Sequence, residues 1–110
     1  MRERVLIVED NKALAKLIAK KMNAHVDMDI VVTHSYAEAI EAIEENDDFF
    51  IALLDINLPD APDGEVVDYV LSKNILAIIL TGSVDENLKK LFIQKNIVDY
   101  VVKDNLDAIN

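Results

Sequence analysis

The chain has 110 residues, which is room for one domain with a single core, and no Pro/Gly/Ser-rich linker divides it. Its hydrophobic fraction of 52% excludes a disordered chain, and the lack of cysteine excludes disulfides, thiolate metal sites and a cysteine nucleophile. The formal net charge of −10 makes direct binding to nucleic acid or to an anionic membrane unfavourable. Because the longest apolar runs are far too short for a signal peptide or a membrane span, we expect a cytoplasmic domain.

Short apolar runs rich in Val and Ile predict five β-strands. In chain order they cover residues 5–8, 28–32, 49–54, 75–80 and 98–102. Several of these runs are nearly continuous rather than alternating, which is typical of strands covered on both faces.

Segments with helical spacing lie between the strands. Their apolar residues recur every three or four positions, and we expect four stripes to face the core: Leu14, Leu17, Ile18 and Met22; Tyr36, Ala39, Ile40 and Ile43; Val66, Val67, Val70 and Leu71; Val84, Leu88, Leu91 and Phe92. Residues 35–38 and 83–86 match the capping box, in which a Ser side chain and a Glu side chain satisfy backbone amides at a helix start. Asp10 or Asn11 can cap the first helix, and residues 63–64 supply a turn before the third.

The alternation of strands and helices predicts an α/β fold, with a parallel sheet covered by helices on both faces. Strand order cannot be read from this pattern. The segment after the last strand, residues 104–110, is compatible with a helix of only about two turns. We therefore expect the last helix to be short or truncated, and residues 1–110 to form one domain of a longer, multidomain protein.

Polar residues follow four of the five predicted strands. In an open parallel sheet, ligands bind beyond the carboxyl ends of the strands. These ends run into Glu9 and Asp10, Asp55, Thr81 and Lys103. Three neighbouring carboxylates need compensating positive charge, which a lysine and a divalent cation would supply. An all-oxygen ligand set favours Mg²⁺ or Mn²⁺, and a carboxylate beside such an ion, a lysine and a hydroxyl can accept a phosphoryl group.

Five short segments match the motifs of a known protein family, both in their order along the chain and in their separations. They are VLIVEDN at 5–11, LLDINLP at 53–59, DG at 63–64, LTG at 80–82 and DYVVK at 99–103. Together they resemble the receiver domain of two-component response regulators over essentially the full chain. The resemblance implies a flavodoxin-like, doubly wound fold whose five-stranded sheet has the order 2-1-3-4-5.

The resemblance also implies the chemistry of the site. Asp55 would accept a phosphoryl group from a histidine kinase or from a small acyl phosphate. Asp10, Asp55 and the backbone carbonyl of Asn57 would hold Mg²⁺ (or Mn²⁺), with Glu9 acting through water. The domain would catalyse its own phosphorylation and dephosphorylation, so we do not expect it to be an enzyme by itself.

The implied switch involves three further residues. Lys103 would pair with the phosphoryl oxygens, Thr81 would move to donate a hydrogen bond to one of them, and Tyr100 would turn inward behind it. This movement would change a partner-binding face and control an output domain in the same longer chain. The output could be a DNA-binding module, a nucleotide cyclase or another enzyme, and the ending at residues 103–105 suggests an enzyme of cyclic-dinucleotide chemistry. A homodimer is also compatible with the resemblance.

Two positions depart from the family pattern. Asp104 stands where the family usually has proline after the lysine, so we expect a trans peptide bond there. The loop at residues 59–64 is one residue longer than usual, which would reshape the chain beside the metal site.

Two alternative functions remain. One is a receiver-like docking module that works without phosphorylation. The other is a Mg²⁺-dependent aspartyl phosphatase, which is disfavoured because the acceptor follows the third strand and residue 57 is Asn. The chain has only two glycines, so no Gly-rich nucleotide-binding turn can form. We expect His25 and His34 to be solvated and to lie away from the acidic strand ends.

Overall fold

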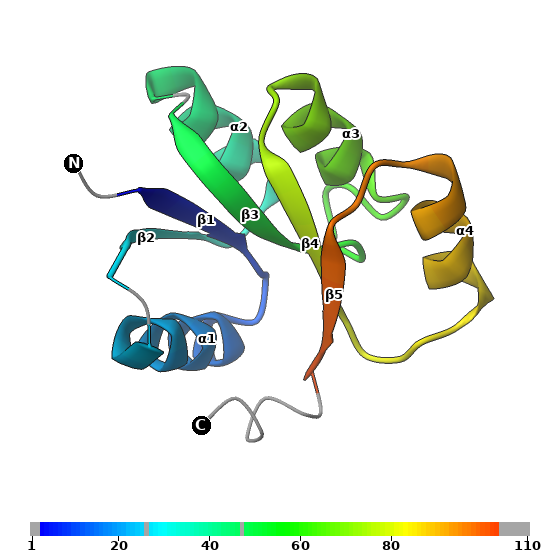
Figure 1. Cartoon of the computed structure of the whole chain (residues 1–110), viewed down its shortest axis with the longest axis horizontal. Coiled ribbons are helices and arrows are strands. Elements are labelled where there is room, and N and C mark those ends of the chain that lie inside the picture. The colour runs from blue at the N-terminus through cyan, green and yellow to red at the C-terminus, as the bar shows by residue number, and fades with distance from the viewer. Residues whose placement is uncertain (1–2, 26, 47, 104–110) are drawn as a thin grey trace.

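The computed structural model describes residues 3–25, 27–46 and 48–103. In this part of the chain, strands and helices alternate as the sequence predicts (Figure 1). The elements are β1 (Arg4–Val8), α1 (Lys12–His25), β2 (Asp29–Thr33), α2 (Tyr36–Glu45), β3 (Phe49–Asp55), α3 (Glu65–Ser72), β4 (Leu76–Thr81), α4 (Glu86–Gln94) and β5 (Asp99–Val102).

The strands form one parallel sheet in the order β2-β1-β3-β4-β5. This order confirms the topology that the family resemblance implies. β3 is the central strand, with β1 and β4 on either side, and β2 and β5 form the two edges. In Figure 1, α1 lies on one side of the sheet, and α2, α3 and α4 lie on the other.

Each face of the sheet has its own core, because side chains alternate along a strand. Val5 and Ile7 of β1 pack with Ile18 of α1 on one face. Leu6 and Val8 pack on the other face with residues of α2, α3 and α4. Strand β1 is thus buried on both faces from its second residue to its last, as its continuous apolar run predicted.

Polar caps begin two of the helices where the sequence placed them. Asn11 Oδ1 accepts a hydrogen bond from Leu14 N–H at 3.0 Å, so Asn11 is the cap of α1. Ser35 Oγ accepts from Glu38 N–H at 3.1 Å at the start of α2. The carboxylate of Glu38 accepts from His34 N–H rather than from Ser35, so the predicted capping box forms only in part. Before α3, Gly64 turns the chain with a φ of 74°.

The predicted start of α4 is wrong. The helix begins at Glu86, and its cap is Asp85, whose side chain accepts from Leu88 N–H at 3.0 Å. Ser83 does not act as the cap because its backbone carbonyl accepts a hydrogen bond from the Thr81 hydroxyl, which keeps the chain in a loop. As a result, Val84 precedes the helix and is 48% exposed instead of joining the core stripe.

The apolar stripe of α1 also differs in detail from the prediction. Ala15 and Ile18 face the core, together with the stem of Lys21, whereas Leu17 is 39% exposed. Leu17 precedes Ile18 by one position, which rotates its side chain about 100° around the helix away from the sheet. The aliphatic part of a lysine can replace an apolar side chain at such a boundary.

The expectation for His34 is wrong, whereas His25 is exposed at the end of α1 as expected. His34 directly follows β2, whose carboxyl end lies at the acidic edge of the sheet, and its side chain is half-buried. Its Nδ1 lies 3.1 Å from the backbone oxygen of Glu9, which can only accept, so Nδ1–H donates.

The predicted last helix and the peptide bond between Lys103 and Asp104 lie outside the described residues. No helix in the described ranges is long and apolar enough to cross a membrane.

Candidate functional site

The site forms at the edge of the sheet where the parallel strands end. The strand register places Val8 beside Leu54, and Asp55 beside Leu80. The residues that follow these positions therefore meet at one edge, as the sequence predicted. Thr81 is the last residue of β4, and Lys103 directly follows β5.

Three carboxylates converge at this edge. Glu9, Asp10 and Asp55 each offer an oxygen atom, and these atoms all lie within 4.8 Å of one another. Glu9 and Asp55 are only 1% and 2% exposed, whereas Asp10 is open to solvent. Such a group, with oxygen as the only donor atom, fits a hard divalent ion that keeps part of its water shell.

One oxygen of Glu9 supports this fit. Glu9 Oε2 accepts a hydrogen bond from Asn11 N–H at 3.0 Å. Glu9 Oε1 is buried, and the Lys103 ammonium lies 2.7 Å away as its ion-pair partner. Because a carboxylate oxygen can accept more than one hydrogen bond, Oε1 could also accept from the water of a bound cation.

Lys103 joins the carboxylates to the fifth strand. Besides its contact with Glu9, its Nζ lies 3.3 Å from Oδ2 of Asp55. Burial alone would lower the pKa of Lys103, but the Glu9 and Asp55 carboxylates outweigh it and raise that pKa above its ordinary value. The ammonium group is therefore charged at neutral pH and compensates part of the negative charge.

The pKa values of the two acidic residues after β1, Glu9 and Asp10, are shifted in opposite directions. Burial raises the pKa of Glu9, and the contact with Lys103 only partly offsets this cost. The pKa of Asp10 is lowered, chiefly through its side-chain contact with Asp55 and further by the positive charge of Lys103. Asp10 thus ionises more readily than Glu9 and stays accessible from solvent.

Backbone amides fix the orientation of the acidic side chains. Asn57 N–H donates to Asp55 Oδ1 at 2.9 Å, which leaves Oδ2 on the side of Lys103. Asn11 N–H holds Glu9 in the same way. The roles of Asn11 and His34 at this site escaped the sequence analysis. A helix cap directly after two acidic residues was a usable signal for Asn11, whereas nothing in the sequence pointed to His34.

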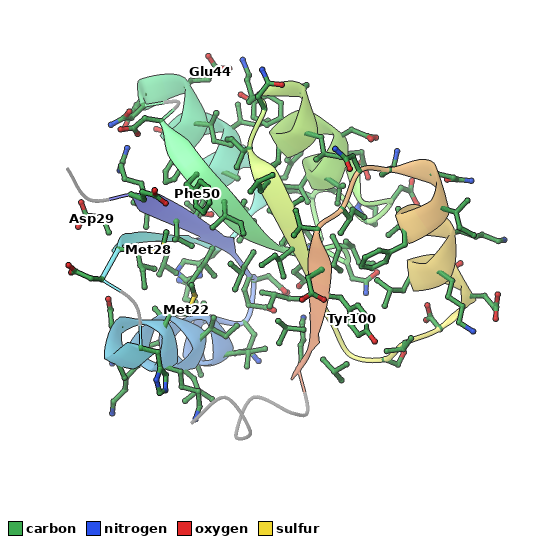
Figure 2. All side chains as sticks on the ribbon, viewed as in Figure 1. Met22, Met28, Asp29, Glu44, Phe50 and Tyr100 are labelled. Carbon is green, nitrogen blue, oxygen red and sulfur yellow. The ribbon has the colours of Figure 1, made fainter. Side chains whose placement is uncertain are left out.

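The switch candidates, Thr81 and Tyr100, have their own partners outside the carboxylate cluster. Thr81 is 6% exposed, and its hydroxyl donates a hydrogen bond to the Ser83 backbone oxygen at 2.7 Å. Tyr100 is 38% exposed on β5 (Figure 2). Its ring stands edge-on to Phe92 of α4, with 5.7 Å between ring centroids. In this conformation Thr81 serves the loop before α4, and Tyr100 lies on the outer edge of the sheet.

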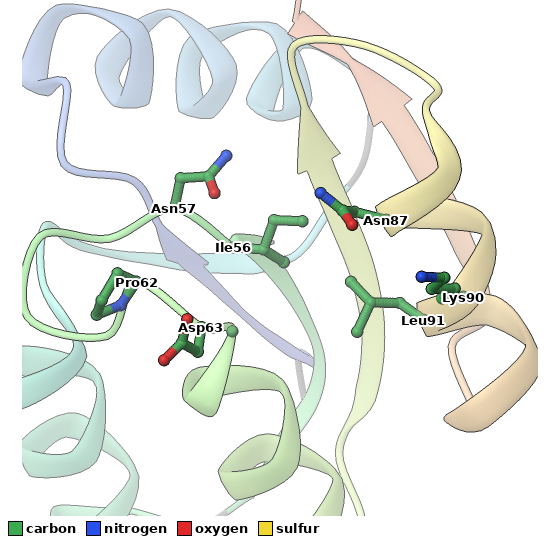
Figure 3. A pocket seen from close by; sticks show the side chains of 8 residues that line it. Ile56, Asn57, Pro62, Asp63, Asn87, Lys90 and Leu91 are labelled. Carbon is green, nitrogen blue, oxygen red and sulfur yellow. The ribbon is translucent and has the colours of Figure 1, made fainter.

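A pocket of about 290 Å³ opens beside the site (Figure 3). It lies between the loop that follows β3 and the first two turns of α4. Ile56, Asn57 and Pro62 line it from the loop, and Asn87 and Lys90 line it from the helix. One side of this loop is therefore not packed against the rest of the domain.

A family model described as the response regulator receiver domain matches residues 5–109. The chain belongs to this family. It is a receiver domain of a two-component system, and such domains are typically not enzymes in the usual sense. The cluster of Glu9, Asp10 and Asp55 is a possible acidic metal site of this receiver domain.

Solved structures agree with this assignment. A structure described as a two-component system response regulator/GGDEF domain protein has a TM-score of 0.82 and 26% identity over 98% of this chain. The chain spans only 43% of the length of that protein. The signal receiver domain of a LuxO repressor protein from Vibrio parahaemolyticus has a TM-score of 0.79 and 29% identity, over 98% of this receiver domain and 86% of its own length.

A Mn²⁺-bound response regulator shares the fold at 22% identity, with a TM-score of 0.79 over 97% of this chain and 88% of its own. Among curated proteins, no significant match was found.

Proposed function

We propose that this receiver domain is a phosphorylatable switch and that Asp55 is the phosphoacceptor. The carrying observation is the convergence of the buried Asp55, the carboxylates of Glu9 and Asp10, and the ammonium of Lys103 at one edge of the sheet. A buried carboxylate between a cation and further acids is costly for stability alone, which favours a functional reading.

In the proposed reaction, a carboxylate oxygen of Asp55 attacks the phosphorus atom of the donor. The bond from phosphorus to the donor's nitrogen or oxygen breaks, and its electron pair leaves with the donor, which yields an aspartyl phosphate. Asn57 N–H and Lys103 orient the carboxylate from opposite sides. After transfer, Lys103 lies within reach of the new phosphoryl oxygens and neutralises part of their charge.

Asp10, Asp55 and the backbone carbonyl of Asn57 would hold the divalent ion, with Glu9 acting through water. When bound, Mg²⁺ or Mn²⁺ would supply positive charge that stabilises the equatorial oxygens of the phosphoryl group. The Mn²⁺-bound response regulator of the same fold supports this class of ion.

The phosphoryl group would then compete for the Thr81 hydroxyl. It adds about −1.5 to −2 charge and three strong acceptors, so it can replace the Ser83 carbonyl as the partner of Thr81. Release of Ser83 would free the loop before α4, and Tyr100 would turn inward beside it. The face of α4 and β5 would change in consequence.

The proposed donor is a histidine kinase, with a small acyl phosphate as a substitute, and the proposed compartment is the cytoplasm. The proposed recipient of the signal is an output domain in the same protein. The similar response regulator/GGDEF domain protein supports an output domain of that type. A homodimer remains part of the proposal.

The direct test is intact mass after incubation with acetyl phosphate, with and without Mg²⁺. We expect one Mg²⁺-dependent phosphoryl adduct that hydroxylamine removes and that Asp55→Asn lacks. Asp99→Asn, at the opposite end of the sheet, is the matched control and should retain the adduct. Absence of an adduct, together with no spectral change on adding beryllofluoride and Mg²⁺, would favour the docking module instead.

A further inference from the structure

The loop after β3 is tied to the start of α2 by a carboxylate. Asp60 Oδ1 accepts a hydrogen bond from Tyr36 N–H, and Asp60 Oδ2 accepts from Ala37 N–H, each at 3.0 Å. Asp60 and these two amides are more than 20 residues apart in sequence. The contact is thus a tertiary clamp rather than a local helix cap.

This clamp differs from the local cap of the same helix. Ser35 takes the next amide, Glu38 N–H, and belongs to the chain that enters α2. Asp60 instead belongs to the loop that leaves the phosphoacceptor strand. Each of the two residues satisfies amides that a helix start leaves free, but only Asp60 restrains a second segment.

Two further restraints hold the loop: a buried turn in its middle, and the hydrogen bonds of Asp63 N–H to Glu65 Oε1 and of Gly64 N–H to the Ala61 carbonyl at its end. Leu58 and Ala61 are fully buried, and Ala61 N–H donates to the Leu58 carbonyl at 3.0 Å, so the middle of the loop forms a tight turn. On the side of α4, the pocket of Figure 3 leaves the loop unpacked. The buried turn and the bonds near α3 therefore hold the middle and the end of the loop, and the clamp of Asp60 ties it to α2.

The same loop begins at the proposed metal site. Asn57 lies two residues after Asp55, donates its N–H to the Asp55 carboxylate, and is three residues before Asp60. We infer that Asp60 is a positioning residue: by holding the loop against α2, it fixes the backbone of Asn57 beside Asp55 and so sets the affinity of the site for a divalent ion. This inference rests on the proposed function, because Asn57 matters only if its carbonyl is a ligand.

A matched pair of variants separates this role from simple support of α2. Asp60→Asn weakens the clamp but keeps one acceptor oxygen, and Asp60→Ala removes it. Ser35→Ala removes a cap from the same helix end without touching the loop. Mg²⁺ affinity is measured by titration calorimetry without any phosphoryl donor, and thermal unfolding shows that each variant is folded. If Asp60→Ala does not fold, Asp60→Asn decides.

We expect Asp60→Asn to weaken Mg²⁺ binding by about tenfold and Asp60→Ala by more, as for other residues that orient metal ligands. Ser35→Ala should leave Mg²⁺ affinity unchanged despite its loss of helix stability. Equal losses of Mg²⁺ affinity in the Asp60 and Ser35 variants would overturn the positioning role alone. Absence of Mg²⁺ binding in the unchanged chain would overturn the proposed metal site and this inference with it.

Amide hydrogen exchange supplies a second readout on the unchanged chain. If the clamp couples α2 to the site, Mg²⁺ must slow exchange at Tyr36 and Ala37, because coupling between two sites is reciprocal. Glu38 N–H, which bonds to Ser35, is the internal control in the same helix turn. Slower exchange at Tyr36 and Ala37 that disappears in Asp60→Asn supports the inference, and uniform slowing of all three amides contradicts it.

Discussion

The ammonium group of Lys103 lies 2.7 Å from Oε1 of Glu9, a carboxylate that is almost fully buried. The pair links the end of β5 to the end of β1, although β3 and β4 lie between these strands in the sheet. This ion pair stabilises the buried charge of Glu9, which would be costly without a partner of opposite charge. The stability of the carboxylate cluster therefore depends on Lys103 when no divalent ion is bound.

Replacing Lys103 by methionine should destabilise the metal-free chain strongly. The change leaves Glu9 and Asp55 close together without a compensating charge. Because the Lys103 side chain is 23% exposed, we expect the lower end of the range for a buried pair, a loss of about 3 kcal/mol in the free energy of unfolding. Urea denaturation in the presence of EDTA measures it. The control is Lys95→Met, which breaks a 2.6 Å ion pair with the exposed Asp68 and should cost about 1 kcal/mol or less. Equal losses in the two variants would contradict the role of Lys103.

Divalent ions should stabilise the folded chain through Asp10. An ion that binds only the folded state at ten times its Kd adds about 1.4 kcal/mol to the free energy of unfolding. We expect this gain on addition of Mg²⁺ or Mn²⁺, and we expect Asp10→Asn to abolish it at the same concentration. Ca²⁺ and Na⁺ at matched ionic strength distinguish specific binding from screening. If the gain in stability persists in Asp10→Asn, the ion binds outside the proposed site.

The clamp between Asp60 and α2 predicts a pH dependence of stability. The hydrogen bonds from Tyr36 and Ala37 lower the pKa of Asp60 below its ordinary value of 3.8. The ionised form therefore favours the folded state, so its contribution is complete above that value and is lost as the pH falls through the lower pKa of the folded chain. We expect the stability of the unchanged chain to fall more steeply than that of Asp60→Asn on acidification below about pH 4. Parallel curves for the two proteins would refute this linkage.

Thr81 should be needed for the response to phosphorylation but not for phosphorylation itself. Thr81→Ala removes the 2.7 Å hydrogen bond to the Ser83 carbonyl, which we expect to cost about 1 kcal/mol of stability. The aspartyl phosphate should still form, because Asp55, Asp10 and Lys103 are unchanged. Amide NMR shifts of the loop before α4 should then no longer change on phosphorylation. Thr81→Ser, which keeps the hydroxyl, should preserve them, and a normal response in Thr81→Ala would exclude this switch.

Much of the site was predictable because it depends on short-range patterns and one general rule. Apolar runs marked the strands, and polar residues directly after them had to meet at one edge, since parallel strands end together. Glu9, Asp10, Asp55 and Lys103 follow from this rule, as their contacts show. The strand order came from the family resemblance, since apolar periodicity carries no information on which strands are neighbours.

The start of α4 could not be located from local sequence preferences. Ser83 and Asp85 are both good caps, and sequence preference alone does not choose between them. The choice follows from the hydrogen bond of Thr81 to the Ser83 carbonyl, which depends on where β4 ends in the folded sheet.

The class of fold, the strands and helices, and the acidic residues at the strand ends depend on hydrophobic periodicity and on neighbours along the chain, so they can be predicted from the sequence. Three features follow instead from the packing of the folded chain: Asp60 holds the start of α2, His34 donates to the backbone of Glu9, and burial raises the pKa of Glu9. Each of these features joins segments more than 20 residues apart or depends on how much water the packed sheet excludes. No local pattern contains that information.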